Sequence, residues 1–167
     1  MRNHKESSLG FTLIEVLMVM ALIALLSTIA LPVIGKSIER AKIAKAKTEM
    51  AAMESAFKAY FSTYNEWHAN LSSGVLDMDL VNMLQGVNAK GMNPNGVSFM
   101  EFTQGSLSPR GYLDPWGRPF RYAVDHNYDG VTLANGQPVR RQVTLWSSGP
   151  EPAIANDDVV SWKIIIL

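Results

Sequence analysis

The strongest constraint on the fold of this chain is an apolar run near its N-terminus, which covers residues 11–34. A helix of roughly 20 apolar residues, at about 1.5 Å per residue, covers the roughly 30 Å hydrocarbon core of a bilayer. A secretory signal peptide has a shorter apolar core with a small-residue cleavage site after it, whereas here a short polar leader precedes the run. The run therefore predicts a membrane-spanning helix.

One carboxylate, Glu15, lies inside this run, and no lysine or arginine follows it until Lys36. A charge within a bilayer costs roughly 2.5–3.5 kcal/mol and requires a partner. One interpretation is an interfacial glutamate of an ordinary membrane anchor, whose side chain reaches back to water. The other is a cut after Gly10, which would create an amino group on Phe11 that can pair with Glu15 of a neighbouring copy.

The segment 10–15 (Gly-Phe-Thr-Leu-Ile-Glu), the apolar run and Pro32 together resemble the leader and N-terminal helix of type IV pilins and type II secretion pseudopilins. In that family, a prepilin peptidase cuts after the glycine that matches Gly10 and methylates the new amine at the residue that matches Phe11. The glutamate that matches Glu15 guides the docking of each subunit into a helical filament. The resemblance also implies that Pro32, which removes a backbone donor, kinks or loosens the helix for packing in the filament.

Length and charge limit the rest of the chain. Of its 167 residues, those after residue 34 suffice for one head domain of ordinary size. The 15 basic and 15 acidic residues balance, so no nucleic-acid partner is expected.

A basic cluster follows the apolar run, and the positive-inside rule would place it in the cytoplasm. The family orientation puts the head outside, and the cluster is then a solvated helix face beside anionic lipid headgroups. Its members are Lys36, Arg40, Lys42, Lys45 and Lys47.

The helix is predicted to continue through residues 35–64, as an amphipathic half after the membrane-spanning half over residues 11–34. Apolar residues recur there at spacings of three and four, and no Gly or Pro occurs between residues 36 and 64. Aromatic members of this stripe could form a ligand box, but at helical spacing core packing is far commoner. We therefore predict that the stripe carries the head: Met50, Met53, Phe57, Tyr60, Phe61 and Tyr64.

Two regions follow the helix. Residues 65–113 are predicted to form a variable connecting region, with a short helix around residues 76–84 and turn-rich loops at 88–95 and 105–111. Residues 114–167 are predicted to form a β region with acidic loops, and its candidate strands cover residues 120–124, 139–147 and 159–166. The expected fold class is α+β and pilin-like, with the second half of the long helix packed on a small C-terminal antiparallel sheet.

The tetrapeptide Asp114-Pro115-Trp116-Gly117 resembles the Asp-Pro-Trp-Gly motif of type II secretion major pseudopilins. Pro115 presets a turn, and Gly117 permits a positive φ, so a structural turn is favoured over a catalytic role.

The terminal segment resembles the calcium loop that closes the same pseudopilins. Carried over by position, Glu151 replaces the family's aspartate, Asp158 matches a later aspartate, and Asn156 or Asp157 adds an oxygen. Calcium takes six to eight oxygen ligands at about 2.3–2.6 Å. Because a longer glutamate between two prolines changes the reach of the ligand, the site could be weakened, rebuilt or lost.

A second acidic loop, over residues 125–130, matches the first half of an EF-hand-type calcium loop. Its candidate ligands are Asp125, Asn127 and Asp129. The position that should hold a bidentate glutamate is Gly136, so an ordinary Asx-rich turn competes with a calcium site.

Catalysis is not predicted. The residues that could take part in catalysis match no known arrangement of nucleophile, general base and oxyanion donors. They include His68, His126, Ser147 and Ser148. The sequence therefore predicts a protein that is not an enzyme.

The chain has no cysteine. Many type IVa pilins close their C-terminal region with a disulfide, whereas major pseudopilins often use calcium, so the resemblance favours a major pseudopilin.

The resemblance implies a structural subunit of a type II secretion pseudopilus, held in the bacterial inner membrane with its head in the periplasm. The implied partners are other copies in a helical homopolymer, the prepilin peptidase, an inner-membrane assembly platform with its ATPase, and minor pseudopilins. Such a filament pushes folded proteins through the outer membrane.

Two alternatives stay open. The first is a type IV pilin or minor pilin for adhesion, motility or DNA uptake, which shares the leader and helix. The second, more remote, is a membrane-anchored calcium-binding module that never polymerises and keeps residues 1–10.

Overall fold

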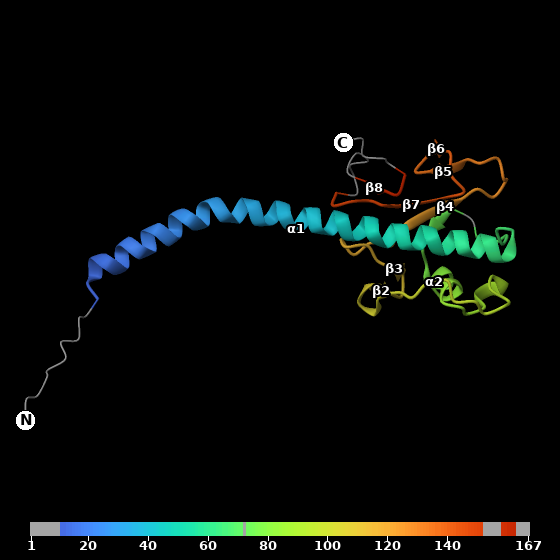
Figure 1. Cartoon of the computed structure of the whole chain (residues 1–167), viewed down its shortest axis with the longest axis horizontal. Coiled ribbons are helices and arrows are strands. Elements are labelled where there is room, and N and C mark those ends of the chain that lie inside the picture. The colour runs from blue at the N-terminus through green and yellow to red at the C-terminus, as the bar shows by residue number, and fades with distance from the viewer. Residues whose placement is uncertain (1–10, 72, 152–157, 163–167) are drawn as a thin grey trace, which may run out of the picture. The chain divides into compact units, whose positions relative to one another are not determined.

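The computed structural model describes residues 11–71, 73–151 and 158–162, apart from the side chains of residues 29–33. The chain divides into two compact units, one up to residue 40 and one from residue 41 onward, and each is described by itself. Its elements (Figure 1) are α1 (Leu13–Tyr64), β1 (Gly74–Val75), α2 (Met78–Leu84), η1 (Ala89–Gly91), η2 (Gln104–Ser106), β2 (Leu107–Ser108), β3 (Gly111–Tyr112), β4 (Arg121–Val124), β5 (Thr132–Ala134), β6 (Gln137–Val139), β7 (Val143–Ser147) and β8 (Val159–Val160).

The long N-terminal helix is confirmed, because α1 is continuous over 52 residues. It ends at Tyr64, since Asn65 adopts a φ of 56°, a left-handed conformation that stops a helix and that asparagine tolerates. Among the described residues, no helix is long and apolar enough to cross a membrane. The membrane span over residues 11–34 therefore stays a prediction. So does the role of Pro32, whose side chain lies outside the described ones.

The second half of α1 carries the head through its apolar stripe, as predicted. Met50, Met53, Phe57 and Tyr60 are buried, and the last two aromatic residues of the stripe pack partly buried against the same core. Phe57 stacks on Tyr122 of β4, with ring centroids 5.4 Å apart. The short helix α2, also predicted, adds buried apolar side chains to this core.

The main sheet has four antiparallel strands in the order β1-β4-β7-β8. Alternate residues of β4 point to opposite faces: Tyr122 and Val124 join the core on α1, and Ala123 joins a second cluster with Ala134 and Trp146. The β5–β6 hairpin supplies part of this second cluster. Because both faces are covered, every residue of β7 is buried.

Three predicted boundaries are corrected. The strand predicted over residues 139–147 is two strands, since β6 ends at Val139 and β7 begins at Val143. Between them the Arg141 N–H donates to the Val139 carbonyl in a turn, at 2.9 Å. The loop predicted at residues 105–111 contains a tight β2–β3 hairpin. The last predicted strand is observed as β8 only, and its residues from 163 onward lie outside the described ones.

We expect Phe57→Ala to destabilise the head by about 3–5 kcal/mol, because it removes a fully buried ring and leaves a cavity between α1 and β4. Urea unfolding of the full chain in detergent, followed by tryptophan fluorescence, measures the change. Ser62→Ala, on the exposed face of the same helix, is the matched control and should change stability by less than about 0.5 kcal/mol. Equal effects of the two variants would contradict this account of the core.

Candidate assembly segment and acidic loops

The predicted processing site begins at the edge of the described chain. Gly10 lies outside the described residues, and Phe11 is the first residue within them, with 84% of its surface exposed. From there to Leu26, most large apolar side chains of α1 are at least half exposed. A contiguous apolar surface of this kind marks a site that binds lipid or another protein.

Glu15 closes the N-terminal end of α1. Its carboxylate oxygen Oε2 accepts hydrogen bonds from the Thr12 backbone N–H and the Thr12 hydroxyl, each at 2.8 Å. The Glu15 N–H in turn faces the Thr12 hydroxyl oxygen at 3.3 Å. Threonine at the cap and glutamate three residues later form a capping box, in which each side chain satisfies a backbone donor that the first helical turn leaves unpaired.

This contact was missed in reasoning from the sequence, which considered only water or a neighbouring copy as the partner of Glu15. The Thr-x-x-Glu spacing before an apolar run is the signal that could have found it. Glu15 therefore has a role within its own chain, and the docking role predicted for it stays a prediction.

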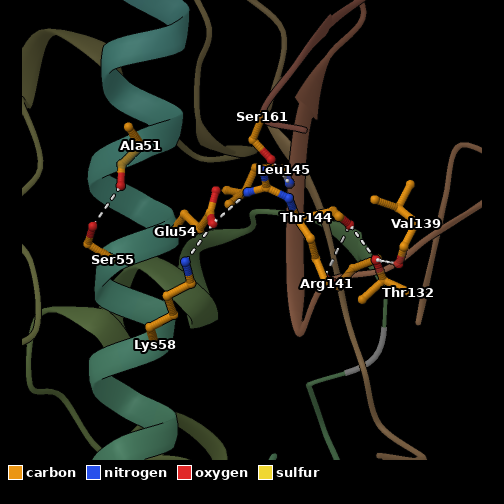
Figure 2. Close-up of polar contacts among 11 residues, drawn as sticks. Ala51, Glu54, Ser55, Lys58, Thr132, Val139, Arg141, Thr144, Leu145 and Ser161 are labelled. Atoms are coloured by element: carbon orange, nitrogen blue, oxygen red, sulfur yellow. Dashed lines mark hydrogen bonds and ion pairs between the residues drawn. The ribbon is translucent and has the colours of Figure 1, made fainter. Parts of the chain in front are cut away.

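Within the head, a buried carboxylate joins α1 to the sheet (Figure 2). Glu54 Oε1 accepts from Lys58 Nζ at 2.8 Å and from Arg141 Nη1 at 3.0 Å. Arg141 lies in the turn between β6 and β7, so this contact ties that turn to α1. The Thr132 and Thr144 hydroxyls lie 3.1 Å apart and share a hydrogen bond that joins β5 to β7 (Figure 2).

The motif at residues 114–117 is a turn, as predicted, and Gly117 has a φ of 81°. Asp114 organises it, because its Oδ1 accepts the N–H groups of Trp116 and Arg118, each at 2.9 Å. Its Oδ2 accepts the hydroxyl of Ser147 at 2.5 Å. The Ser147 oxygen also accepts the Gly149 N–H at 3.2 Å. This Asp114–Ser147 clamp ties the turn to the last residue of β7, where the terminal loop begins.

We expect Asp114→Ala to destabilise the head by about 2–3 kcal/mol, since the buried Ser147 hydroxyl and two partly buried backbone N–H groups lose a charged acceptor. Ser147→Ala removes one of these hydrogen bonds and should cost about 1 kcal/mol. Ser148→Ala, one residue beyond the clamp, is the matched control. Thermal unfolding of the full chain in detergent compares the three variants, and an Asp114→Ala protein as stable as the control would refute the clamp.

The first acidic loop is closed by its own hydrogen bonds. Asp125 is buried, and its two carboxylate oxygens accept the N–H groups of Asp129 at 3.1 Å and Gly130 at 2.8 Å. The Asn127 amide donates to Asp129 Oδ2 at 2.8 Å. These are the bonds of an Asx-rich turn, the alternative that competed with a calcium site. The Tyr128 hydroxyl accepts a hydrogen bond from the backbone N–H of Trp67 at 3.0 Å.

The second acidic loop is described only at its ends. Glu151 is exposed, and Asp158 accepts the Asn135 amide at 2.7 Å, whereas Asn156 and Asp157 lie outside the described residues. Within the described ranges, no three acidic, histidine or cysteine side chains gather closely enough to hold a metal. Calcium at either loop therefore stays a prediction.

Another carboxylate, Glu49, is partly buried on the head-facing side of α1. Its Oε1 accepts the Tyr112 hydroxyl at 3.0 Å and is 3.9 Å from Lys45 Nζ. Its Oε2 is buried and has no hydrogen-bond partner among the described residues. Burial raises the pKa of Glu49 above its ordinary value of 4.5, the charge of Asp114 adds to this rise, and the Tyr112 and Lys45 contacts oppose it.

This raised pKa predicts a pH dependence. Because folded Glu49 holds its proton at a higher pH than the unfolded chain does, stability falls as the pH rises from below 4.5 through the raised pKa. Glu49→Gln removes this titration, so its melting temperature should lack the fall that wild type shows in this window. Melting curves of both proteins at closely spaced pH values measure the difference, and parallel pH profiles would contradict it.

The comparisons with known proteins converge on one kind of protein. Residues 7–31 match the family described as the prokaryotic N-terminal methylation motif. The chain is 30% identical to the type IV major pilin protein PilE1 of Neisseria gonorrhoeae over 142 residues, which cover 79% of this chain and 71% of that pilin. It is 29% identical to a fimbrial protein of Neisseria meningitidis serogroup A over 153 residues, 90% of this chain and 81% of the relative.

A third relative is a secretion protein. The chain is 26% identical to the type II secretion system core protein G of Klebsiella pneumoniae over 156 residues, 93% of this chain and 94% of the relative. No solved structure is a significant match.

Proposed function

Since this chain belongs to the family of type IV pilins and type II secretion pseudopilins, we propose that its filament is a type II secretion pseudopilus. Members of this family are polymerising structural subunits and not enzymes. The match to the secretion core protein supports this choice, because it covers nearly the whole of both chains. The motif at residues 114–117, which resembles that of the major pseudopilins, supports it as well.

The observation that carries polymerisation is the exposed apolar surface of α1 from Phe11 to Leu26. In the inner membrane, lipid tails cover this surface while the head faces the periplasm. In the filament, the same side chains pack against α1 of neighbouring copies, so the surface stays out of water in both states. The subunit can therefore pass from bilayer to filament without exposing its apolar helix to water.

Cleavage after Gly10 supplies the polar part of the contact. It leaves Thr12 as the second residue of the mature chain, so the capping box survives the cut. The new amine at Phe11, methylated by the prepilin peptidase, lies at the same end of α1 as the Glu15 carboxylate. An amine from one copy then pairs with Glu15 of the next, and the two charges leave water together.

We expect Glu15→Ala to abolish filaments, because it removes both the cap and the charge that meets the neighbouring amine. Thr12→Ala is the matched control. It breaks the same cap at a cost of about 0.5–2 kcal/mol but keeps the carboxylate, so filaments should still form. Sheared filaments are quantified by immunoblot in cells that process both variants equally. Filament loss in both variants would mean that capping alone explains Glu15.

Two measurements test the class of filament. Intact mass of the protein from its native membrane should show a chain that starts at methylated Phe11, whereas a retained leader would support the non-polymerising anchored module. Deleting the gene should then stop secretion of folded proteins into the medium. Normal secretion with loss of surface fibres and motility would instead make the chain a type IV pilin.

A further inference from the structure

The charged residues in the described part of the first unit, which ends at residue 40, fall into two groups along α1. Glu15 lies in the first turn of the helix. The next charged residues along the chain are Lys36, Glu39 and Arg40, and residues 16–35 contain no lysine, arginine, aspartate or glutamate. A long uncharged stretch of helix therefore separates the carboxylate of the first turn from a small group rich in cations.

The two hydroxyl groups in the uncharged stretch are satisfied within the helix. Ser27 donates its hydroxyl to the Ile23 carbonyl at 2.7 Å. Thr28 donates its hydroxyl to the Ala24 carbonyl at 2.7 Å. Because these donors keep their hydrogen bonds inside the helix, they carry no unpaired polar hydrogen into hydrocarbon.

The length of helix between the two charged groups matches a bilayer. From Glu15 to Lys36 an α-helix rises about 32 Å, and the hydrocarbon core of a bilayer is about 30 Å thick. From Lys36 to Arg40 the helix rises about 6 Å, which is close to the thickness of one headgroup layer. If Glu15 lies at one interface, Lys36 and Arg40 therefore lie among the headgroups of the other.

The two cations share one side of the helix. Lys36 and Arg40 are both exposed, and side chains four residues apart are neighbours, with Cβ atoms about 5–6 Å apart. The opposite side carries Ile34 and Ile38, each 54% exposed. Glu39 is partly buried and is the one carboxylate of this group, so the group keeps a net positive charge. The spacing lets both cations contact the same phosphate.

We propose that Lys36 and Arg40 bind the phosphate of an anionic phospholipid in the periplasmic leaflet of the inner membrane. The proposal rests on the proposed function, since it requires a subunit that is stored in that membrane with its head in the periplasm. The positive-inside rule disfavours cations on this side, and anionic headgroups supply the charge that attracts them there. The bound lipid sets the depth at which the subunit waits, and the contact must break when the subunit enters the filament.

Lipid titration tests the contact on the processed protein, purified in detergent and followed by native mass spectrometry. Phosphatidylglycerol should bind more tightly than phosphatidylcholine, which carries a phosphate but no net charge. Lys36→Gln/Arg40→Gln should weaken phosphatidylglycerol binding by roughly tenfold or more, because each cation near an anionic surface contributes to the affinity. Higher ionic strength should weaken binding to the wild type, since salt screens exposed charges.

Two further variants separate a phosphate contact from net charge. Lys36→Arg/Arg40→Lys keeps both cations and should keep the affinity. Lys47→Gln/Arg110→Gln removes two exposed cations of the second unit and should leave the affinity within about twofold of wild type, because their charges are screened at this distance from the lipid. Equal losses in this control and in Lys36→Gln/Arg40→Gln would overturn the proposal. Displacement of the lipid by an equal concentration of inorganic phosphate would also overturn it, because the site would then hold a free anion.

Cysteine labelling tests the depth of the two cations, because the chain has no cysteine of its own. A side chain at Gly35 meets open space, so Gly35→Cys fits the helix. In nanodiscs of phosphatidylglycerol and phosphatidylethanolamine, this thiol should react slowly with a membrane-impermeant maleimide. Ser62→Cys, on the exposed side of the head helix, is the control and should react rapidly. Equal rates would place Lys36 and Arg40 above the headgroups and refute the contact.

The outcomes separate the two proposals. If wild-type chains keep their leader and form no filaments, the proposed function itself fails. If wild type is processed and polymerises, but lipid binding does not depend on Lys36 and Arg40, only the lipid contact is refuted.

Discussion

The packing of the apolar stripe of α1 against the sheet is the contact on which the head depends. Phe57 and Tyr122 stack at its centre, so the helix and the central strands are held at one place by buried aromatic rings. The loops and turns of the head are arranged around this contact. The polar ties, such as the Arg141–Glu54 bridge and the Asp114–Ser147 clamp, attach loops to a frame that hydrophobic burial has already set.

One helix serves two different environments because its sequence changes character along its length. From Phe11 to Leu26 the apolar side chains point outward on all sides, which suits lipid or neighbouring helices. Beyond residue 41 only one stripe is buried, and lysines and small residues occupy the rest of the surface. The two units therefore differ in which part of the helix surface they keep out of water.

Buried polar groups in the head share a common arrangement, in which one carboxylate satisfies several donors. Asp114 and Asp125 each accept backbone N–H groups from a turn that follows them in the chain. These hydrogen bonds fix the shape of each turn, and the turns bring loops to defined positions on the head.

Local patterns determined the helices of this protein. The spacing of Met50, Met53, Phe57 and Tyr60 is enough to place the buried face of α1, because helical periodicity depends only on residues three or four apart. The Asp-Pro-Trp-Gly turn was readable for the same reason, since Pro115 and Gly117 set its backbone directly. The motif at residues 10–15 likewise identified the family without any knowledge of the fold.

Only the tertiary structure decided which distant residues meet. Nothing near Arg141 in the sequence indicates that it reaches Glu54, and nothing near Ser147 indicates that it bonds to Asp114. Short strands such as β1 and β5 also escaped prediction, because two or three residues carry too little periodicity and are held by their partners. Contacts between residues far apart in the chain depend on how the elements pack, and a local pattern contains no record of that packing.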